Sequence, residues 1–274
     1  MKRPILVAAA LSVAALASGL VLMTASSVAA SSLPTLTLAV TPKTVTVGGS
    51  EVSGAVSIVT TVTGEKSDVP ALFLLKPGVT PAEFNKVAGA LGSNSPLDAI
   101  DPYASIVFNY VATEGTSTAE TWLQPGTYIA ANSGSGEAVF TVTPSATPAL
   151  LPVPAAEVDA IDFGFRGAST LHDGELVRFK DDGYLIHMVA YVPVKSVADA
   201  TKVEALLRAG DTKNARKYAI GKLSMFAGPL SHAELQQEVI TQPPGVYVIL
   251  CLMNAEDGRE HFQLGMFRTI TIAK

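Results

Sequence analysis

Two parts of this chain repeat the same order of motifs, and in the best-matched motif the corresponding residues are each 116 positions apart. ALFLLKPGV precedes TPAEFNKVAGAL, and MVAYVPVK precedes SVADATKVEALL in the same way. Thr80 and Glu83 in the first copy correspond to Ser196 and Asp199 in the second, and each pair has the spacing of a helix capping box. Later, QPGTYIAAN matches QPPGVYVILC, and a Thr-rich strand follows each. This order predicts a duplicated domain, so the fold must be one that can be built twice.

Most of each copy consists of short runs in which β-branched residues alternate with others. TLTLAVT, KTVTVG and VSGAVSIVTTVT lie between Pro and Gly residues, as strands do. Asp182-Gly183 within LVRFKDDGYLIHMVAYV predicts a β-hairpin. The second copy has more helical spacing, and we expect helices in KSVADATKVEALLRAG, DTKNARKYAIGK and SHAELQQE. We therefore predict a mainly β fold of two tandem Greek-key β-sandwich domains with a short inserted helical excursion in each.

The segment VTPSATPALLPVPAAE separates the two copies. It contains four prolines and almost no charge, which is typical of a linker. We place the linker at residues 144–156, the first domain at 33–143 and the second at 157–274.

Residues 1–30 have the composition of an export signal peptide. Lys2 and Arg3 precede an apolar run from Pro4 to Met23, and Val28-Ala29-Ala30 suits cleavage after Ala30. The run is also long enough to remain as an uncleaved membrane anchor. We expect a secreted or extracytoplasmic protein that is soluble once the signal is removed. Cleavage changes the formal charge from −5 to −7, and a mildly acidic chain without a basic cluster is a poor candidate for binding nucleic acid.

Cys251 is the only cysteine in the chain. It cannot form an internal disulfide, so it is buried, pairs between chains or binds a ligand. It lies near the end of the expected strand PPGVYVILC, and His261 and Met266 follow before the last strand. A further histidine, His187, lies within the apolar strand YLIHMVAYV. Taken singly, a cysteine or histidine in such a strand is more often a core residue, but together these side chains form the ligand set of a blue-copper site.

The second copy resembles a cupredoxin, in particular the cupredoxin-like domains of exported bacterial proteins. In cupredoxins a strand P-G-x-Y-x-x-x-C ends in the ligand cysteine, and H-x-x-x-G-M or a similar motif precedes the final strand. Pro244-Gly-Val-Tyr-Val-Ile-Leu-Cys251 and His261-Phe-Gln-Leu-Gly-Met266 fit this pattern. The resemblance covers the C-terminal half and implies one mononuclear copper site. It implies that His187, Cys251 and His261 are equatorial ligands and that Met266 is the axial ligand.

The chain departs from the cupredoxin pattern at three points. Nine residues separate Cys251 from His261, where small cupredoxins usually have two to four, although loops of nearly this length occur in the blue-copper domains of nitrite reductases. Met188 stands where many cupredoxins have an asparagine after the upstream histidine. Asn132 occupies the position of the cysteine in the first copy, and residues 33–143 contain no histidine or methionine. We therefore expect the first domain to lack metal ligands and to share only the fold.

The two other histidines have no ligand spacing around them. His172 precedes an Asp173-Gly174 turn, so we expect it to be exposed. His232 lies in Ser231-His-Ala-Glu234, which we interpret as the start of a helix.

The motifs of several enzyme classes are missing from the sequence. The chain has four histidines and no His-x-His pair, too few for a multicopper oxidase or a copper nitrite reductase within one chain. There is also no P-loop, Gly-x-Ser-x-Gly or His-Glu-x-x-His motif. A catalytic thiol is disfavoured because Cys251 lies in a strand, with Glu256, Asp257 and Glu260 close by in the sequence. We therefore predict that the protein is not an enzyme.

Two functional hypotheses follow from the sequence. The first is an exported copper-binding cupredoxin-like protein that acts as an electron carrier or in extracytoplasmic copper handling. Its acidic loop, Glu256 to Glu260, would face an unknown redox or surface partner protein. The alternative is a metal-free β-sandwich pair used for adhesion or binding, with the former ligand positions filling the core.

Overall fold

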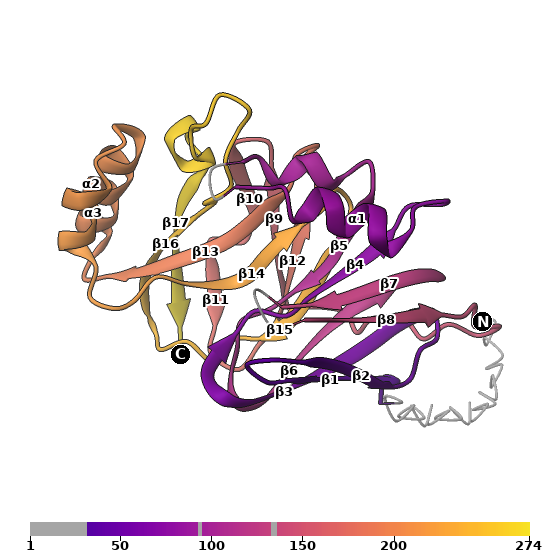
Figure 1. The fold of residues 1–274 in the computed structure, drawn as a ribbon. Coiled ribbons are helices and arrows are strands. Elements are labelled where there is room, and N and C mark those ends of the chain that lie inside the picture. The colour runs from indigo at the N-terminus through magenta and orange to yellow at the C-terminus, as the bar shows by residue number, and fades with distance from the viewer. Residues whose placement is uncertain (1–31, 93–94, 133–135) are drawn as a thin grey trace, which may run out of the picture. The chain divides into compact units, whose positions relative to one another are not determined.

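The structure is a computed structural model that describes residues 32–92, 95–132 and 136–274, of which Leu33–Lys274 form one compact unit (Figure 1). The predicted signal peptide lies outside the described residues.

Elements of the first half are β1 (Thr35–Val40), β2 (Val45–Gly49), β3 (Gly54–Asp68), β4 (Ala71–Leu75), α1 (Pro81–Ala88), the 3-10 helix η1 (Leu97–Ile100), β5 (Ala104–Asn109), β6 (Ala112–Leu123), β7 (Gly126–Ala131) and β8 (Glu137–Val142). Elements of the second half are β9 (Ala156–Ile161), β10 (Gly164–Gly167), β11 (Thr170–His172), β12 (Leu176–Asp181), β13 (His187–Val194), α2 (Val197–Arg208), α3 (Thr212–Ala215), η2 (Arg216–Tyr218), β14 (Ser224–Leu230), β15 (Leu235–Val239), β16 (Gly245–Leu250), η3 (His261–Leu264) and β17 (Phe267–Ala273). Across the described ranges, none of the helices combines the length and apolar character needed to cross a membrane.

One eight-stranded sheet runs through both halves, in the order β10-β9-β12-β15-β6-β3-β1-β2. Read from the centre outward, the strand order of one half mirrors that of the other, because β6 and β15 pair antiparallel through Gln236↔Thr121 and Gln237↔Glu120. Both halves also contain the same parallel pair, β1 with β3 and β9 with β12. The predicted duplication is therefore visible in the strand order itself.

The second layer repeats the same symmetry. The first half contributes the sheet β5-β4-β7-β8, and the second contributes β11-β17-β16-β13-β14. The two sheets approach each other at β5 and β14, where Ser231 N–H donates to the Ile106 carbonyl at 3.0 Å and the Ser231 hydroxyl accepts from the Ile106 N–H at 2.9 Å. Each half is thus a cupredoxin-like β-sandwich, and the two sandwiches share a continuous sheet and a hydrogen-bonded interface.

The predicted mainly β fold with a helical excursion in each half is confirmed. In the first half α1 and η1 lie between β4 and β5, and in the second α2, α3 and η2 lie between β13 and β14. Thr80 forms the expected reciprocal capping box with Glu83, and Pro81 is the first helical residue. Ser196 caps α2 by accepting from the Asp199 N–H.

The predicted hairpin at Asp182-Gly183 is wrong, because β12 and β13 belong to different sheets. Asp181 accepts hydrogen bonds from the N–H groups of Gly183 at 2.9 Å and His187 at 3.1 Å, which bends the chain across from one layer to the other. Gly183 is needed here for close approach, since a Cβ would lie 2.5 Å from His187 Nε2. Asp182-Gly183 therefore marks a crossover from the eight-stranded sheet to the five-stranded sheet.

The helix expected in SHAELQQE is also wrong. Its first residues form a turn in which Ala233 has a φ of 67°, and the rest is strand β15. Gln236, Gln237 and Glu238 are buried in this strand. Pairing with both β12 and β6 satisfies their backbone groups, and it overrides the local helical preference.

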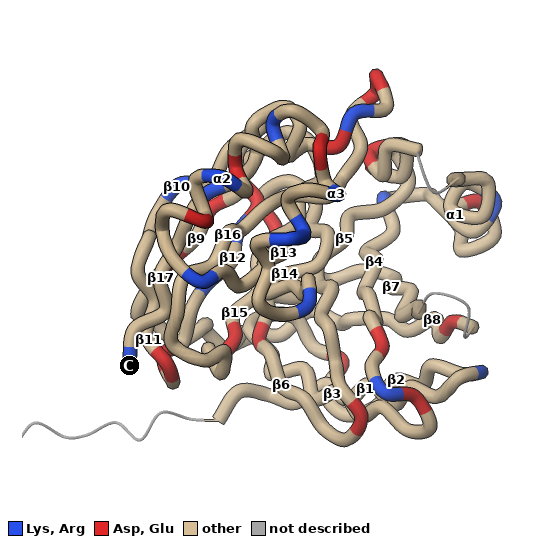
Figure 2. Tube along the Cα trace, turned by 90° about the vertical axis from the view of Figure 1, so that its left-hand side faces the viewer, with Lys and Arg blue, Asp and Glu red and all other residues tan. Residues whose placement is uncertain are grey.

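The halves meet closely near one end of the sandwich. Ile186, from the second half, packs with Phe84, Ile100 and Ile106 of the first half in a single hydrophobic cluster. Charged residues are unevenly distributed, and several lysines and arginines lie along α2, α3 and the segment after them (Figure 2).

Candidate metal centre

Adjacent strands bring the predicted ligand residues to one end of the second sandwich. His187 begins β13, and Cys251 follows β16, which pairs antiparallel with β13. His261 begins η3, after a loop closed by a bridge between Asn254 and Glu260. Backbone hydrogen bonds tie this loop to Cys251: Cys251 N–H donates to the Met266 carbonyl and Phe262 N–H donates to the Cys251 carbonyl, both at 3.1 Å. These bonds bring the far end of the long loop, with His261, back beside Cys251 at the end of β16.

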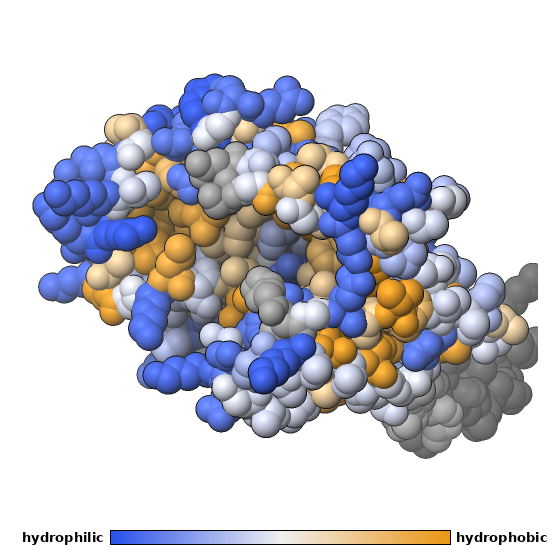
Figure 3. Space-filling view, in the orientation of Figure 1, coloured by the Kyte–Doolittle hydropathy of each residue, from blue (hydrophilic) through white to orange (hydrophobic). Residues whose placement is uncertain are grey.

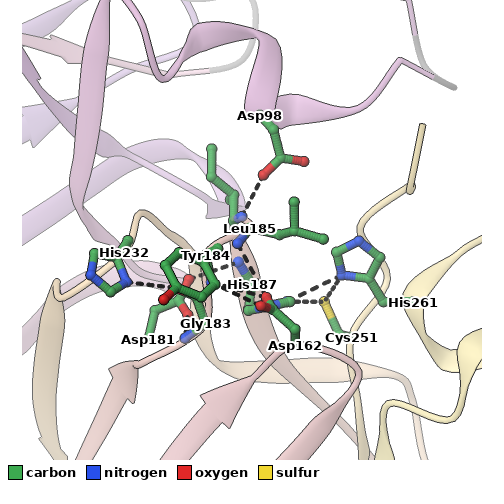
Figure 4. Close-up of polar contacts among 11 residues, drawn as sticks. Asp98, Asp162, Asp181, Gly183, Tyr184, Leu185, His187, His232, Cys251 and His261 are labelled. Atoms are coloured by element: carbon green, nitrogen blue, oxygen red, sulfur yellow. Dashed lines mark hydrogen bonds and ion pairs between the residues drawn. The ribbon is translucent and has the colours of Figure 1, made fainter.

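Three donor atoms converge in the interior (Figure 4). His187 Nδ1 lies 3.1 Å from His261 Nδ1, and Cys251 Sγ lies 3.5 Å from His261 Nδ1 and 3.9 Å from His187 Nδ1. The three atoms form a triangle whose centre lies about 2.0 Å from each of them. This is close to the metal–ligand distances of about 2.0–2.3 Å in tetrahedral zinc sites. The exposed fractions of His187, Cys251 and His261 are 1%, 0% and 0%. Within the described part of the chain, no other cluster of three such side chains was found.

Met266 is fully buried and belongs to the same hydrophobic cluster as Cys251. Its backbone N–H donates to the His261 carbonyl at 3.0 Å. The structure therefore places all four predicted residues at one end of the sandwich. It brings three of them together through their donor atoms. Their role as metal ligands stays a prediction.

The protonation of this cluster suits a metal ion. His187 Nε2 donates to Asp162 Oδ1 at 3.1 Å, which leaves Nδ1 with its lone pair toward Cys251 and His261. Burial lowers the pKa of His187 to about 4, and it also lowers the pKa of His261, so both rings are neutral near pH 7. Burial raises the pKa of the Cys251 thiol to about 12. A cation would therefore have to displace the thiol proton, as metal ions do when they bind cysteine.

The hydrogen bonding and the chemical nature of the donor atoms also suit a metal ion. His261 Nε2 is buried without a hydrogen-bond partner, and the edge of the Phe163 ring packs against the imidazole with centroids 5.3 Å apart. Two neutral imidazoles and a thiol so close together leave lone pairs with few donors to satisfy them. Thiolate and thioether sulfur suit Cu(I), and imidazole suits copper in general, so the residues fit a copper ion.

Three carboxylates surround this cluster, and sequence reasoning missed all of them. Asp162, at the end of β9, accepts from the N–H groups of Tyr184 at 3.0 Å and Leu185 at 3.2 Å as well as from His187. Burial alone would raise the pKa of Asp162, but the hydrogen bonds from His187 and from these two N–H groups hold it below its usual value. Burial raises the pKa of Asp181 to about 8. Local sequence carried no signal for Asp162, because its partner lies 25 residues away.

The third carboxylate comes from the first half of the chain. Asp98, in η1, accepts from the Ile186 N–H at 2.6 Å and so holds the residue before His187. Asp98 also lines a cavity of about 600 Å³ with Phe163, Leu185, Leu264 and the acidic loop, including Glu256. The half without ligands thus helps to build the walls around the site.

The remaining histidines lie away from the three donor atoms. His172 is exposed in β11, as expected, and its backbone N–H donates to Glu175. His232 does not begin a helix. Its Nδ1 lies 2.6 Å from the Gly183 carbonyl, and its ring stacks on Tyr184 with centroids 5.7 Å apart. His232 therefore contacts the crossover segment next to the candidate site.

Comparisons with known proteins found similarity among solved structures. No protein-family model matches the chain, and no curated protein matches it by sequence. Reduced auracyanin from Roseiflexus castenholzii is 21% identical over 43% of this chain and 95% of its own, with a TM-score of 0.27. A copper-containing nitrite reductase from Thermus scotoductus is 11% identical over 88% of this chain and 68% of its own, with a TM-score of 0.26. A multicopper oxidase from Pseudomonas thermotolerans is 10% identical over 87% and 67%, with a TM-score of 0.22.

The two β-sandwiches have a cupredoxin-like fold, and the described residues of the second half hold one buried His-Cys-His cluster that could hold a metal ion. The prediction that the protein is not an enzyme is corrected. The structures that match most of this chain include a copper nitrite reductase and multicopper oxidases, which are enzymes, so the tandem arrangement gives no ground for excluding catalysis. That prediction rested on the missing enzyme motifs, on the strand setting of Cys251 and on a count of histidines within one chain. Such a count does not test whether one copper site can serve a reaction.

Proposed function

We propose that the protein binds one copper ion through His187, Cys251 and His261, with Met266 as a weak axial ligand, and that it serves electron transfer or copper handling. The observation that carries this proposal is the convergence of two Nδ1 atoms and Sγ on a common point, in a pocket closed to solvent. Copper bound there would supply reversible one-electron chemistry.

The surrounding residues prepare the donors for this role. Asp162 fixes the tautomer of His187, so Nδ1 faces the cluster. Pairing of β13 with β16 sets the distance between His187 and Cys251, and the backbone bonds of η3 hold His261. Side chains fixed in this way limit the rearrangement that accompanies a change in metal charge.

The location and the partner are part of the proposal. The basic and apolar composition of residues 1–30 supports export to an extracytoplasmic compartment. Residues 256–259 of the acidic loop are exposed beside a cavity lined by Phe163, whose ring packs against His261, which supports contact with a redox partner protein at this face.

The metal-free alternative has less support. A cysteine in a hydrophobic cluster agrees with it. A purely structural core does not need two imidazole nitrogens 3.1 Å apart, or a buried His261 Nε2 without a partner.

A copper titration of residues 31–274 tests the proposal. We expect an intense visible band from thiolate-to-copper charge transfer, which Cys251→Ser and His261→Ala abolish or shift. The matched control is His172→Ala, which removes an exposed histidine and should leave the band unchanged. A ligand that binds only the folded state also raises the melting temperature. Absence of both the band and the thermal gain in the wild-type protein would refute copper binding.

A further inference from the structure

The helical excursion of the second half carries an unusual share of positive charge. Seven of the 19 Lys and Arg residues lie between residues 195 and 222, against three of the 24 Asp and Glu residues. The sequence shows no basic run because these residues are spaced along the segment, but α2, α3 and η2 bring them onto one part of the surface (Figure 2). The excursion is therefore positive on an acidic protein.

The three acidic side chains in this segment are engaged within the fold. Asp199 binds Lys202 and the cap residue Ser196, Asp211 caps α3, and Glu204 accepts from the Thr269 hydroxyl at 2.7 Å. Four bases near the end of the excursion are exposed to solvent. They are Lys213, Arg216, Lys217 and Lys222, and we call them the basic patch.

Exposed aliphatic side chains lie within the basic patch. Ile220 is 67% exposed and Leu223 is 51% exposed, and both lie in the segment that follows η2. Next to them a cavity of about 510 Å³ has an apolar lining that includes Leu207, Leu252 and Phe262. Figure 3 shows hydrophobic residues at the surface beside the hydrophilic outer side of α2 and α3. The patch thus combines positive charge with apolar side chains that water solvates poorly.

We propose that the basic patch, together with Ile220 and Leu223, docks the protein on the surface of a bilayer that contains anionic lipids. Lysines and arginines next to such a bilayer are attracted by its negative surface potential. Aliphatic side chains among them enter the boundary between head groups and acyl chains. Charge complementarity alone would also suit an acidic protein. The exposed aliphatic pair and the apolar cavity behind it favour a lipid surface. This inference does not depend on copper.

Vesicle flotation with metal-free residues 31–274 tests the proposal, because Leu33–Lys274 form a compact unit without the signal segment. We expect the protein to float with phosphatidylcholine vesicles that contain phosphatidylglycerol, and not with phosphatidylcholine alone. Each base near an anionic surface contributes roughly fivefold to binding, so the double variant Lys213→Glu, Lys217→Glu should bind at least about 30-fold more weakly. Raising the salt from about 0.1 M to about 1 M should also release the protein.

Two further variants separate a specific contribution of the basic patch from an effect of net charge, and a contribution of the aliphatic side chains from attraction by charge alone. Lys43→Glu, Lys86→Glu changes the net charge equally at exposed positions of the first half and should bind like the wild type. Ile220→Ser, Leu223→Ser keeps the charges and should weaken binding about tenfold. All substituted positions are exposed, and unchanged melting temperatures would confirm that the variants fold.

Three results would overturn the proposal. The first is a wild-type protein that stays unbound. The second is an equal loss in the first-half control, which would indicate an effect of net charge alone. The third is full binding after removal of both aliphatic side chains. That result would mean that the basic patch binds by charge alone, as it would to an acidic protein.

Discussion

Replacement of Asp162 by asparagine tests how the fold prepares His187 for a metal. Asp162 Oδ1 accepts from His187 Nε2 at 3.1 Å, and both carboxylate oxygens lie within reach of the Tyr184 N–H, at 3.0 and 3.2 Å. Asparagine keeps one acceptor, but its amide N–H₂ would face another donor. The imidazole therefore loses a charged partner and part of its orientation, while all four predicted ligands remain.

The size of the effect follows from the bond that is weakened. A hydrogen bond to a charged group contributes about 1.5–3 kcal/mol, and a neutral one about 0.5–1.5 kcal/mol. The difference of roughly 1–1.5 kcal/mol corresponds to about tenfold in copper affinity, within the range of about 10–100-fold for groups that orient metal ligands. Because copper stabilises only the folded state that binds it, each tenfold loss of copper affinity lowers the free energy of unfolding of the copper-bound protein by about 1.4 kcal/mol. In a domain of this size it should reduce the copper-induced rise in melting temperature by about 3–6 °C.

Competition with a chelator of known affinity would measure this loss, and a melting curve would measure the linked stability. The control is Asp173→Asn, which removes the same charge from an exposed turn after β11 and should leave copper affinity unchanged. Equal affinities for Asp162→Asn and the wild-type protein would refute the view that this carboxylate positions His187. Equal losses in both variants would point to net charge instead.

Three other substitutions test the fold. Phe179→Ala removes a fully buried ring stacked on Phe226 at 5.2 Å, and we expect chemical denaturation to show a loss of about 3–5 kcal/mol; a loss below about 1 kcal/mol would contradict this packing. Ser231→Ala leaves the buried Ile106 N–H between the halves unpaired and should cost about 1–3 kcal/mol in the same assay, whereas unchanged stability would show that water replaces the hydroxyl. Burial raises the pKa of Glu234 to about 7 from 4.5, so the folded chain keeps a proton that the unfolded chain releases between these values. The free energy of unfolding should therefore contain a component that falls as the pH rises through this interval, and Glu234→Gln should remove it in denaturation curves at several pH values; an identical pH dependence in the variant would exclude Glu234 as the source.

Features encoded by neighbouring residues were predicted well. The capping box of Thr80 and Glu83 needs only three residues of spacing, and α1 begins as expected. The short spacing from Cys251 to His261 likewise brings these two side chains together, and the resemblance to cupredoxins supplied the distant His187; that they and Met266 bind a metal stays a prediction. The duplication could be predicted because the two copies keep the same order of motifs, with an identical offset of 116 residues at the helix start.

Features decided by distant partners were not predictable in this way. An Asp-Gly pair indicates a turn, but it does not show whether the next strand stays in the same sheet, so the crossover at Gly183 was mistaken for a hairpin. SHAELQQE has a cap-like start, yet its glutamines lie in a strand because β6 of the other half pairs with them. Asp98 and Ile186 are 88 residues apart, and their contact exists only because the two halves pack together.

The mirrored strand order reduces the length of sheet edge that could pair with another chain. A strand at the rim of a sheet offers unpaired backbone groups to any other chain, and proteins keep such rims short or covered. By joining β6 to β15, each sandwich covers the rim that the other would leave open. The outer rims of the joined sheet are β2 and β10, of five and four residues. The sandwich of the first half, which contributes none of the predicted ligands, can therefore be retained for a reason unrelated to metal, since it covers a sheet edge of the sandwich that holds them.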